Sequence, residues 1–222
     1  MSKYLKKFSI HSEYDAYING SDAILPNVSI CTTEGDVHYN PYVPYDPYNG
    51  HDHVDLGLPS GTIWATMNIG ANDVTDYGNY YMYGKGVDAY SVTSGDSNYN
   101  GTENPLAESA DTVVQTWGGN WHTPTSLQCK ELIDNTTSVW ISNYQDSGYN
   151  GMLFTATNGN FVFFPAGGRW DNGFDDGNDK GRYWSSTPDG NNGAKDIEFD
   201  KGGVYINDHG RQAGFLVRGV VG

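Results

Sequence analysis

The sequence contains no long apolar run and few cysteines, and both shortages exclude classes of protein. No segment approaches the roughly 20 consecutive apolar residues that a membrane-spanning helix requires. The two cysteines, Cys31 and Cys129, are too few for a disulfide framework and match no zinc-ligand spacing. The start, MSKYLKKFSIHSEY, has basic residues but no apolar stretch behind them, unlike a secretory signal. We therefore expect a chain made in the cytoplasm, without membrane insertion and with buried thiols.

Positive charge is also scarce, because 12 Lys and Arg residues face 27 Asp and Glu residues, for a net charge of −15. Such an acidic surface repels phosphate backbones, so we expect no nucleic-acid partner. In place of helix-forming residues there are 29 glycines and 17 tyrosines. This composition favours short strands, many turns and an aromatic core.

Three segments differ in character, and we predict a small N-terminal unit at 1–38, a linker at 39–53 and one domain at 54–222. In the first unit, a short helix is expected at Ser12–Ile18 with Ser12 as its N-cap. Two strands, Asn27–Thr32 and Asp36–Tyr39, are expected around the turn Thr33-Glu34-Gly35.

The linker is set apart by Pro41, Pro44 and Pro47, whose spacing favours extended polyproline conformation. His51 and His53, with His38 nearby, are either solvated side chains or metal ligands. A flexible His-Asp-His stretch is more often solvated, so solvation is the preferred reading.

One helix of the large domain is well specified by its sequence. Thr125 is the expected N-cap and Gln128 completes a capping box three residues later. Cys129, Leu132 and Ile133 share the face that we expect to be buried, and the helix should end near Asn135.

Strands are expected on both sides of this helix. Thr62–Met67 should follow a turn at Pro59-Ser60-Gly61, and Asp76–Gly84 reads as an aromatic strand. Met152–Thr157 and Phe161–Pro165 should form a hairpin around Asn158-Gly159. The end of the chain carries four short expected strands: Tyr183–Ser186, Ile197–Phe199, Val204–Ile206 and Phe215–Val220.

Five motifs occur in order: VDLGLPSGTIWATMNIGA, DYGNYYMYGK, WGGNWHTPTSLQCKELI, RYWSST and GFLVRGV. Together they resemble the Fibrobacter major-paralogue type of C-type lectin-like domain, within the formylglycine-generating-enzyme branch. The resemblance implies an α+β fold over about Val54 to Val220. That branch includes the variable proteins of diversity-generating retroelements and phage receptor-binding proteins. The N-terminal unit resembles the start of gut Bacteroidales phage and prophage proteins.

Four tryptophans lie inside or beside these motifs, namely Trp64, Trp117, Trp121 and Trp184. We expect them in the core, and ligand stacking is the alternative. His122 is read as a structural partner of a backbone group rather than as a base.

Catalysis is not expected. Formylglycine-generating relatives use cysteines near the C-terminus, whereas no cysteine follows Cys129. We expect no cofactor and no essential metal. The segment Asp171–Lys180 fails the calcium-loop template, because Lys180 and Thr187 stand where acidic or amide ligands are required. The EPN and WND motifs of sugar-binding C-type lectins are absent too, which leaves an irregular calcium site as the open alternative.

The C-terminal region alternates between framework residues and stretches of Asp, Asn, Gly, Tyr, His and Phe. In the family that the chain resembles, retroelement mutagenesis replaces adenines, mostly in Asn codons, and can yield Asp, Gly, Ser, Tyr, His, Phe, Ile and others, but not Lys, Glu, Gln, Trp or Met. Asp171–Asp179 and Tyr205–Gly210 contain only such residues. Ordinary surface loops are also rich in Asp, Asn and Gly, so diversification and plain loop composition both remain open.

We expect the polar stretches of this region to be loops that meet on one exposed face. Aromatic side chains there would supply buried area, and carboxylates and amides would select a basic or hydrogen-bonding ligand. The predicted ligand-binding residues are Trp170, Asp171, Asn172, Phe174, Asp175, Asp176, Asn178, Asp179, Asp189, Asn191, Asn192, Asp196, Tyr205, Asn207, Asp208 and His209.

The preferred functional hypothesis is a receptor-binding protein of a phage or prophage tail, exposed on the virion. Its expected partners are a host cell-surface protein or glycan, other virion proteins bound through the N-terminal unit and, in a homotrimer, two further copies of the chain. A bacterial surface adhesin or carbohydrate-binding module is the second hypothesis. An enzyme of the formylglycine-generating class is the third.

Overall fold

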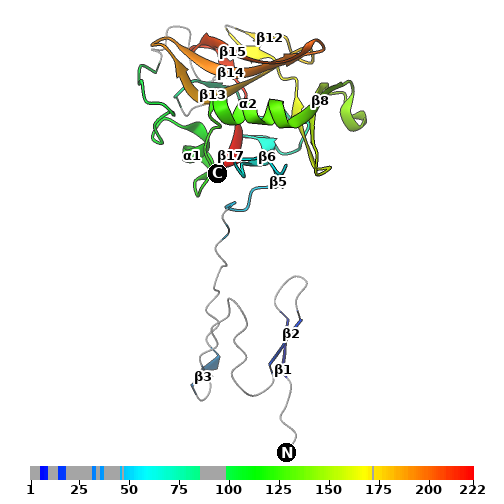
Figure 1. Ribbon diagram of the computed structural model, residues 1–222. Coiled ribbons are helices and arrows are strands. Elements are labelled where there is room, and N and C mark those ends of the chain that lie inside the picture. The colour runs from blue at the N-terminus through cyan, green and yellow to red at the C-terminus, as the bar shows by residue number, and fades with distance from the viewer. Residues whose placement is uncertain are drawn as a thin grey trace, which may run out of the picture. The chain divides into compact units, whose positions relative to one another are not determined.

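The computed structural model describes residues 6–9, 15–18, 32–33, 36–37, 46, 48–85, 99–171 and 173–222. The chain separates into two units, Met1–Asp46 and Pro47–Gly222, each drawn in Figure 1. The division falls inside the segment that the sequence predicts as a linker. No helix among the described residues is long and apolar enough to cross a membrane.

The N-terminal unit contains two short hairpins. β1 (Lys6–Ser9) pairs antiparallel with β2 (Asp15–Ile18), and β3 (Thr32–Thr33) pairs with β4 (Asp36–Val37). The helix predicted over Ser12–Ile18 is therefore wrong at Asp15–Ile18. A helix of this length is marginal alone, whereas a paired strand gains a partner for each backbone group. The predicted second hairpin is present in the pairs Thr32↔Val37 and Thr33↔Asp36, so Thr33, predicted in the turn, is paired. The rest of its predicted strands, with Cys31, lies outside the described residues.

In its described part, the larger unit combines two α-helices with four small antiparallel sheets, so it is an α+β unit that is mainly sheet. The helices are α1 (Thr112–Trp117) and α2 (Ser126–Asn135), with a 3₁₀ turn, η2, at Tyr144–Asp146. The first nine strands are β5 (His53–Asp55), β6 (Ile63–Asn68), β7 (Tyr81–Met82), β8 (Thr136–Ile141), β9 (Gly151–Ala156), β10 (Phe161–Pro165), β11 (Arg169–Trp170), β12 (Phe174–Asp175) and β13 (Gly181–Asp189). The last four are β14 (Gly193–Asp200), β15 (Gly203–Gly210), β16 (Gly214–Phe215) and β17 (Arg218–Val221).

The sheets have the strand orders β10-β9-β8, β12-β11-β16-β7, β13-β14-β15 and β17-β6-β5. Figure 1 shows α2 below the β13-β14-β15 sheet, with β6 and β17 on the far side of the helix. The predicted hairpin forms as β9 and β10, in the register Phe161↔Thr155. The aromatic strand predicted at Asp76–Gly84 is mostly wrong, because only Tyr81–Met82 pairs, with β16.

α2 confirms its sequence prediction. The hydroxyl of Thr125 accepts a hydrogen bond from the Gln128 backbone N–H, and the Gln128 side chain accepts one from the Thr125 N–H. The helix ends at Asn135, and Cys129 and Leu132 are buried in the core between α2 and the sheets. The capping box thus fixes where the helix begins and which face it presents.

Thr125→Ala is expected to lower the free energy of unfolding by about 1 kcal/mol, because the alanine leaves an N-terminal amide of α2 without its acceptor. Urea denaturation measures this change. Ser126→Ala is the matched control, since Ser126 takes no part in the cap and alanine suits a helix. An equal loss in both variants would contradict a specific role for the capping box.

The core is aromatic, as the composition predicts. Trp64, Trp121 and Trp184 are buried, which confirms them as core residues, while Trp117 is only half-buried. Trp184 stacks on Phe215 with ring centres 4.2 Å apart, and its Nε1–H donates to the carbonyl of Tyr81. His122 contacts the carbonyl oxygens of Thr123 and Gly222 through its two ring nitrogens, in agreement with a structural role.

Two buried arginines tie the sheets together through carbonyl groups. Arg218 donates to Asn68 Oδ1 and to the carbonyls of Ala65 and Phe163. Burial lowers the pKa of Arg218 to about 10. The fully buried Arg211 donates to the carbonyls of four residues in two separate segments, and these are Tyr99, Gly101, Gly190 and Gly193.

Candidate ligand-binding face

One of the stretches predicted as C-terminal loops is a strand, and this corrects the sequence prediction, whereas Asp171–Asp179 has strand only at Phe174–Asp175 among its described residues and 190–192 is a turn. Tyr205–Gly210 belongs to β15, the edge strand of the β13-β14-β15 sheet, and Asp196 lies in β14. The composition of Tyr205–Gly210 predicts a loop, because Asp, Asn and Gly are rare in strands. Pairing with β14 over eight positions, from Gly193↔Gly210 to Asp200↔Gly203, overrides that preference.

The register places one set of polar side chains on the same face of this sheet. Asp196 pairs with Asn207, and Glu198 pairs with Tyr205. Arg182 of β13 pairs with Glu198, and His209 comes from the same side of β15. We call this set the β15 face; its residues are Arg182, Asp196, Glu198, Tyr205, Asn207 and His209.

Ion pairs connect the β15 face to the segment before β13. Arg182 donates from Nε to Glu198 Oε2 at 2.9 Å, and its Nη2 lies 2.8 Å from Asp176 Oδ2. The Lys180 ammonium is 3.7 Å from Glu198 Oε1. Because the Arg182 side chain is only 5% exposed, these carboxylates offset a buried charge.

His209 lies between two carboxylates. Its Nδ1 is 3.0 Å from Asp196 Oδ1, and its Nε2 is 3.7 Å from Glu198 Oε2. Asp196 is fully buried, so the prediction that it contacts ligand directly is not supported by its position. Burial raises the pKa of Asp196, and its hydrogen bond with His209 acts in the opposite direction. Asp196 Oδ2 is buried without a hydrogen-bond partner.

Asp196, Glu198 and His209 form the single group of three acidic or histidine side chains, among the described residues, with metal-ligand atoms within 4.8 Å of one another. The group does not fit a divalent cation well. The guanidinium of Arg182 already occupies Glu198 Oε2, and Lys180 lies against the other oxygen. A metal would have to displace one cation and approach a second.

Exposed aromatic side chains flank this network. Tyr205 is 52% exposed on β15, and Phe174 is 49% exposed on β12. The Phe174 ring packs edge-on against Tyr80, with ring centres 5.9 Å apart, and this contact helps to hold Phe174 in place. Asp175 beside it is exposed and pairs with Arg169 at 3.3 Å. Figure 1 shows β12 at the same end of the unit as β14 and β15.

The other predicted residues are divided. Asp189 and Asp208 form ion pairs with Lys195 on the opposite face of the sheet, so the prediction of one common face is wrong for them. Asn191 and Asn192 are exposed at the β13–β14 hairpin, and Asp171 and Asp179 are exposed next to β12. Trp170 is half-buried against the core, and Asn172 lies outside the described residues.

Asn178 has a structural role. Its Oδ1 accepts from the Asn150 N–H and the Tyr77 hydroxyl, and its Nδ2 donates to the Gly148 carbonyl. Its φ of +65° is a left-handed conformation that asparagine tolerates better than most residues. The side chain is thus committed to holding the 143–150 segment.

Sequence reasoning missed Arg182 and Glu198, which organise the face. Arg182 lies in the motif RYWSST and Glu198 in the expected strand Ile197–Phe199, and neither is among the predicted ligand-binding residues. The sequence signal for these two residues is strand alternation. Once the β13–β14 register is known, alternation places Arg182, Trp184, Asp196 and Glu198 on one face of the sheet.

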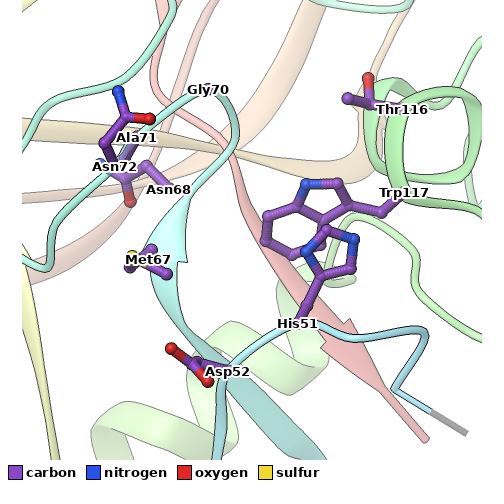
Figure 2. Close-up of a pocket in the computed structure, with 9 residues that line it drawn as sticks. All are labelled: His51, Asp52, Met67, Asn68, Gly70, Ala71, Asn72, Thr116 and Trp117. Carbon is purple, nitrogen blue, oxygen red and sulfur yellow. The ribbon is translucent and has the colours of Figure 1, made fainter. Parts of the chain in front are cut away.

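A separate pocket of about 280 Å³ lies between the segment before β5, the end of β6 and α1. Figure 2 shows His51 over the ring of Trp117, with Asp52, Met67 and Asn72 across the opening. The His51 and Trp117 rings stack at 4.1 Å, and Tyr48 stacks on His53 at 3.5 Å. These contacts give both histidines an aromatic packing role and do not support the metal alternative for them; His38 lies outside the described residues.

The pocket is a weak candidate for ligand binding. It is smaller than the roughly 300–1,000 Å³ of most small-molecule sites. Its buried polar residue, Asn68, already bonds Arg218, Tyr77 and Tyr183. The β15 face therefore remains the better candidate site.

Comparison with known proteins adds no assignment to this geometry: no family model, no curated protein and no solved structure matches the chain.

Proposed function

We propose that the unit Pro47–Gly222 is a ligand-binding domain of the C-type lectin-like fold, and that the chain is a receptor-binding protein of a phage or prophage tail. The ligand is a protein or glycan on the surface of a host cell, and the N-terminal unit attaches the domain to the virion. The five sequence motifs support the fold. The β15 face, together with Phe174 and Asp175 of β12, is the proposed contact surface.

One observation carries the proposal: two large aromatic side chains, Tyr205 and Phe174, are about half exposed on strands whose neighbouring groups are held in place. Tyr205 pairs with Glu198, which Arg182 binds, and Phe174 packs against Tyr80. Aromatic side chains on a preorganised support lose little entropy on binding.

The chemistry of the surface favours binding over catalysis. Cys129, the cysteine that the structure describes, is buried, and burial raises the pKa of its thiol. A thiolate is the reactive form of cysteine, so this residue is poorly suited to covalent chemistry. The exposed groups beside the aromatics are the Asp175 carboxylate and the Asn207 amide, which suit basic or hydroxyl-rich ligands.

Tyr205→Ala and Phe174→Ala are each expected to weaken attachment to host cells by about 2 kcal/mol, near 30-fold in affinity, because central aromatics dominate binding surfaces. Labelled protein is titrated against a panel of gut Bacteroidales strains, and bound protein is measured by flow cytometry. The free energy of unfolding should change by about 0.5 kcal/mol or less, because both rings are half exposed.

Phe161→Ala is the matched control, since Phe161 is 52% exposed but lies on β10. Equal binding losses in all three variants would contradict the proposed surface. Protease treatment of the cells removes a protein receptor, whereas periodate destroys a glycan receptor. The two treatments therefore distinguish the two classes of ligand. Binding that survives replacement of both Tyr205 and Phe174 would place the contact elsewhere.

Diversification by a retroelement is a further part of the proposal. Asn207 and His209 on β15, and Asp171, Asp175 and Asp179 around β12, are residues that adenine mutagenesis produces. Sequencing of the flanking DNA tests this directly. We expect a reverse transcriptase gene and an imperfect repeat of the codons for 170–220; flanking DNA without both would exclude the mechanism.

A further inference from the structure

His209 has an acidic group at each ring nitrogen. Asp196 Oδ1 lies 3.0 Å from Nδ1 and Glu198 Oε2 lies 3.7 Å from Nε2. Neutral imidazole carries one N–H, so it can donate to one carboxylate while its other nitrogen turns a lone pair toward the second. Imidazolium carries an N–H on both nitrogens, so it can donate a hydrogen bond to Asp196 and form an ion pair with Glu198. The geometry therefore suits the protonated ring.

The charges around His209 lead to the same conclusion. The connected cluster contains three carboxylates, Asp176, Asp196 and Glu198, and two permanent cations, Lys180 and Arg182. One additional proton on the Asp196–His209 pair makes the cluster neutral, whichever atom holds it. Without that proton, a negative charge remains in a region where Asp196 Oδ2 is already buried and without a partner.

Other groups near the pair are uncharged or are directed elsewhere. Burial raises the pKa of the Cys129 thiol, and the nearby Asp196 carboxyl raises it further, so the thiol stays uncharged near neutral pH. On the β16 side, His209 meets the edge of the Phe215 ring at 5.1 Å. The guanidinium of Arg211 is directed to the carbonyls of Gly190 and Gly193. Asp208 belongs to the opposite face of the sheet, where it pairs with Lys195.

We propose that His209 is a proton-operated switch of the β15 face. In its protonated form it joins β15 to both carboxylates of β14, and the cluster is neutral. Loss of the proton releases the contact with Glu198 and leaves a net negative charge beside Tyr205 and Asn207. The consequence for ligand binding rests on the proposed function: the face would favour cationic ligands more strongly as the pH rises between about 5 and 8, where histidine ordinarily changes charge.

The direction of the effect on stability follows from proton linkage. Burial raises the pKa of Asp196, so the folded state retains a proton there at higher pH than the unfolded chain does. This contribution to stability is present at low pH and is lost as the pH rises through the folded-state pKa. His209 is 22% exposed, so solvent limits the effect.

The test is a pH titration of the whole chain, without ligand, from pH 5 to 8.5. The backbone amide resonances of Tyr205 and Asn207 are expected to follow a single-proton curve in this range. In His209→Gln the curve should disappear. In His53→Gln it should persist, because His53 is exposed on β5 and stacks on Tyr48.

Flat amide shifts in wild type, or an unchanged curve in His209→Gln, would overturn the switch. Repeating the titration in EDTA should leave the curve in place; its loss would assign the site to a metal. Cell binding is then compared at pH 6 and pH 8. Amides that titrate in a protein that binds no cell would refute the proposed function alone, and binding with flat amides would refute the switch alone.

Discussion

Trp184→Ala is expected to lower the free energy of unfolding by about 3–5 kcal/mol, the range seen when a large aromatic is removed from a packed core. The Trp184 side chain is 2% exposed. The alanine would leave a cavity against Phe215 and Tyr83, which pack on the indole at 4.2 and 5.7 Å between ring centres. It would also deprive the buried Tyr81 carbonyl of the Nε1–H donor.

Urea unfolding, followed by circular dichroism, measures this loss. Leu127→Ala is the control, because Leu127 is 77% exposed on α2 and should change stability by about 0.5 kcal/mol or less. Trp184→Phe should recover much of the packing but not the hydrogen bond. A loss below about 1 kcal/mol in Trp184→Ala would mean that the indole is not part of a close-packed core.

Arg211→Met is expected to lower the free energy of unfolding by about 3 kcal/mol. The methionine fills similar volume but leaves four carbonyls, previously bonded at 2.8–2.9 Å, without donors. Two of them belong to the β13–β14 hairpin and two to the 99–101 segment. Both segments should therefore lose protection against amide hydrogen exchange, which mass spectrometry can locate.

Arg211→Lys should recover only part of the loss, because a single ammonium cannot span four acceptors as a planar guanidinium does. Lys201→Met, in the exposed turn between β14 and β15, is the control for loss of a positive charge. If Arg211→Met and Lys201→Met were equally stable, the carbonyl contacts would contribute nothing measurable.

The parts of the fold that sequence predicted well are those encoded locally. The start of α2 depends on Thr125 and Gln128, three residues apart, and the β9–β10 turn depends on Asn158 and Gly159. Such short-range patterns carry their own geometry. The Trp core was also predictable, because large aromatics in an acidic, glycine-rich chain have few other places to pack.

The site was predicted less well because its geometry depends on pairing between distant segments. Asp196 reads as a surface residue until β13 and β15 bring Arg182 and His209 to it. Alternation on β15 sends Asn207 and Asp208 to opposite faces, a separation that composition alone does not reveal. For Asn178 the reason is different: a left-handed backbone conformation and three side-chain hydrogen bonds to residues distant in the sequence give it a structural role.

Arg211 binds main-chain oxygen atoms, and every amino acid supplies the same main-chain oxygen. Its hold on the β13–β14 hairpin therefore does not depend on which side chains the hairpin carries. Gly190 has a φ of +60°, a conformation that disfavours its replacement by other residues, whereas Asn191 and Asn192 are exposed and do not have a positive φ. The fold thus contains two positions where mutations can accumulate at little cost in stability, next to the surface that we propose meets the host.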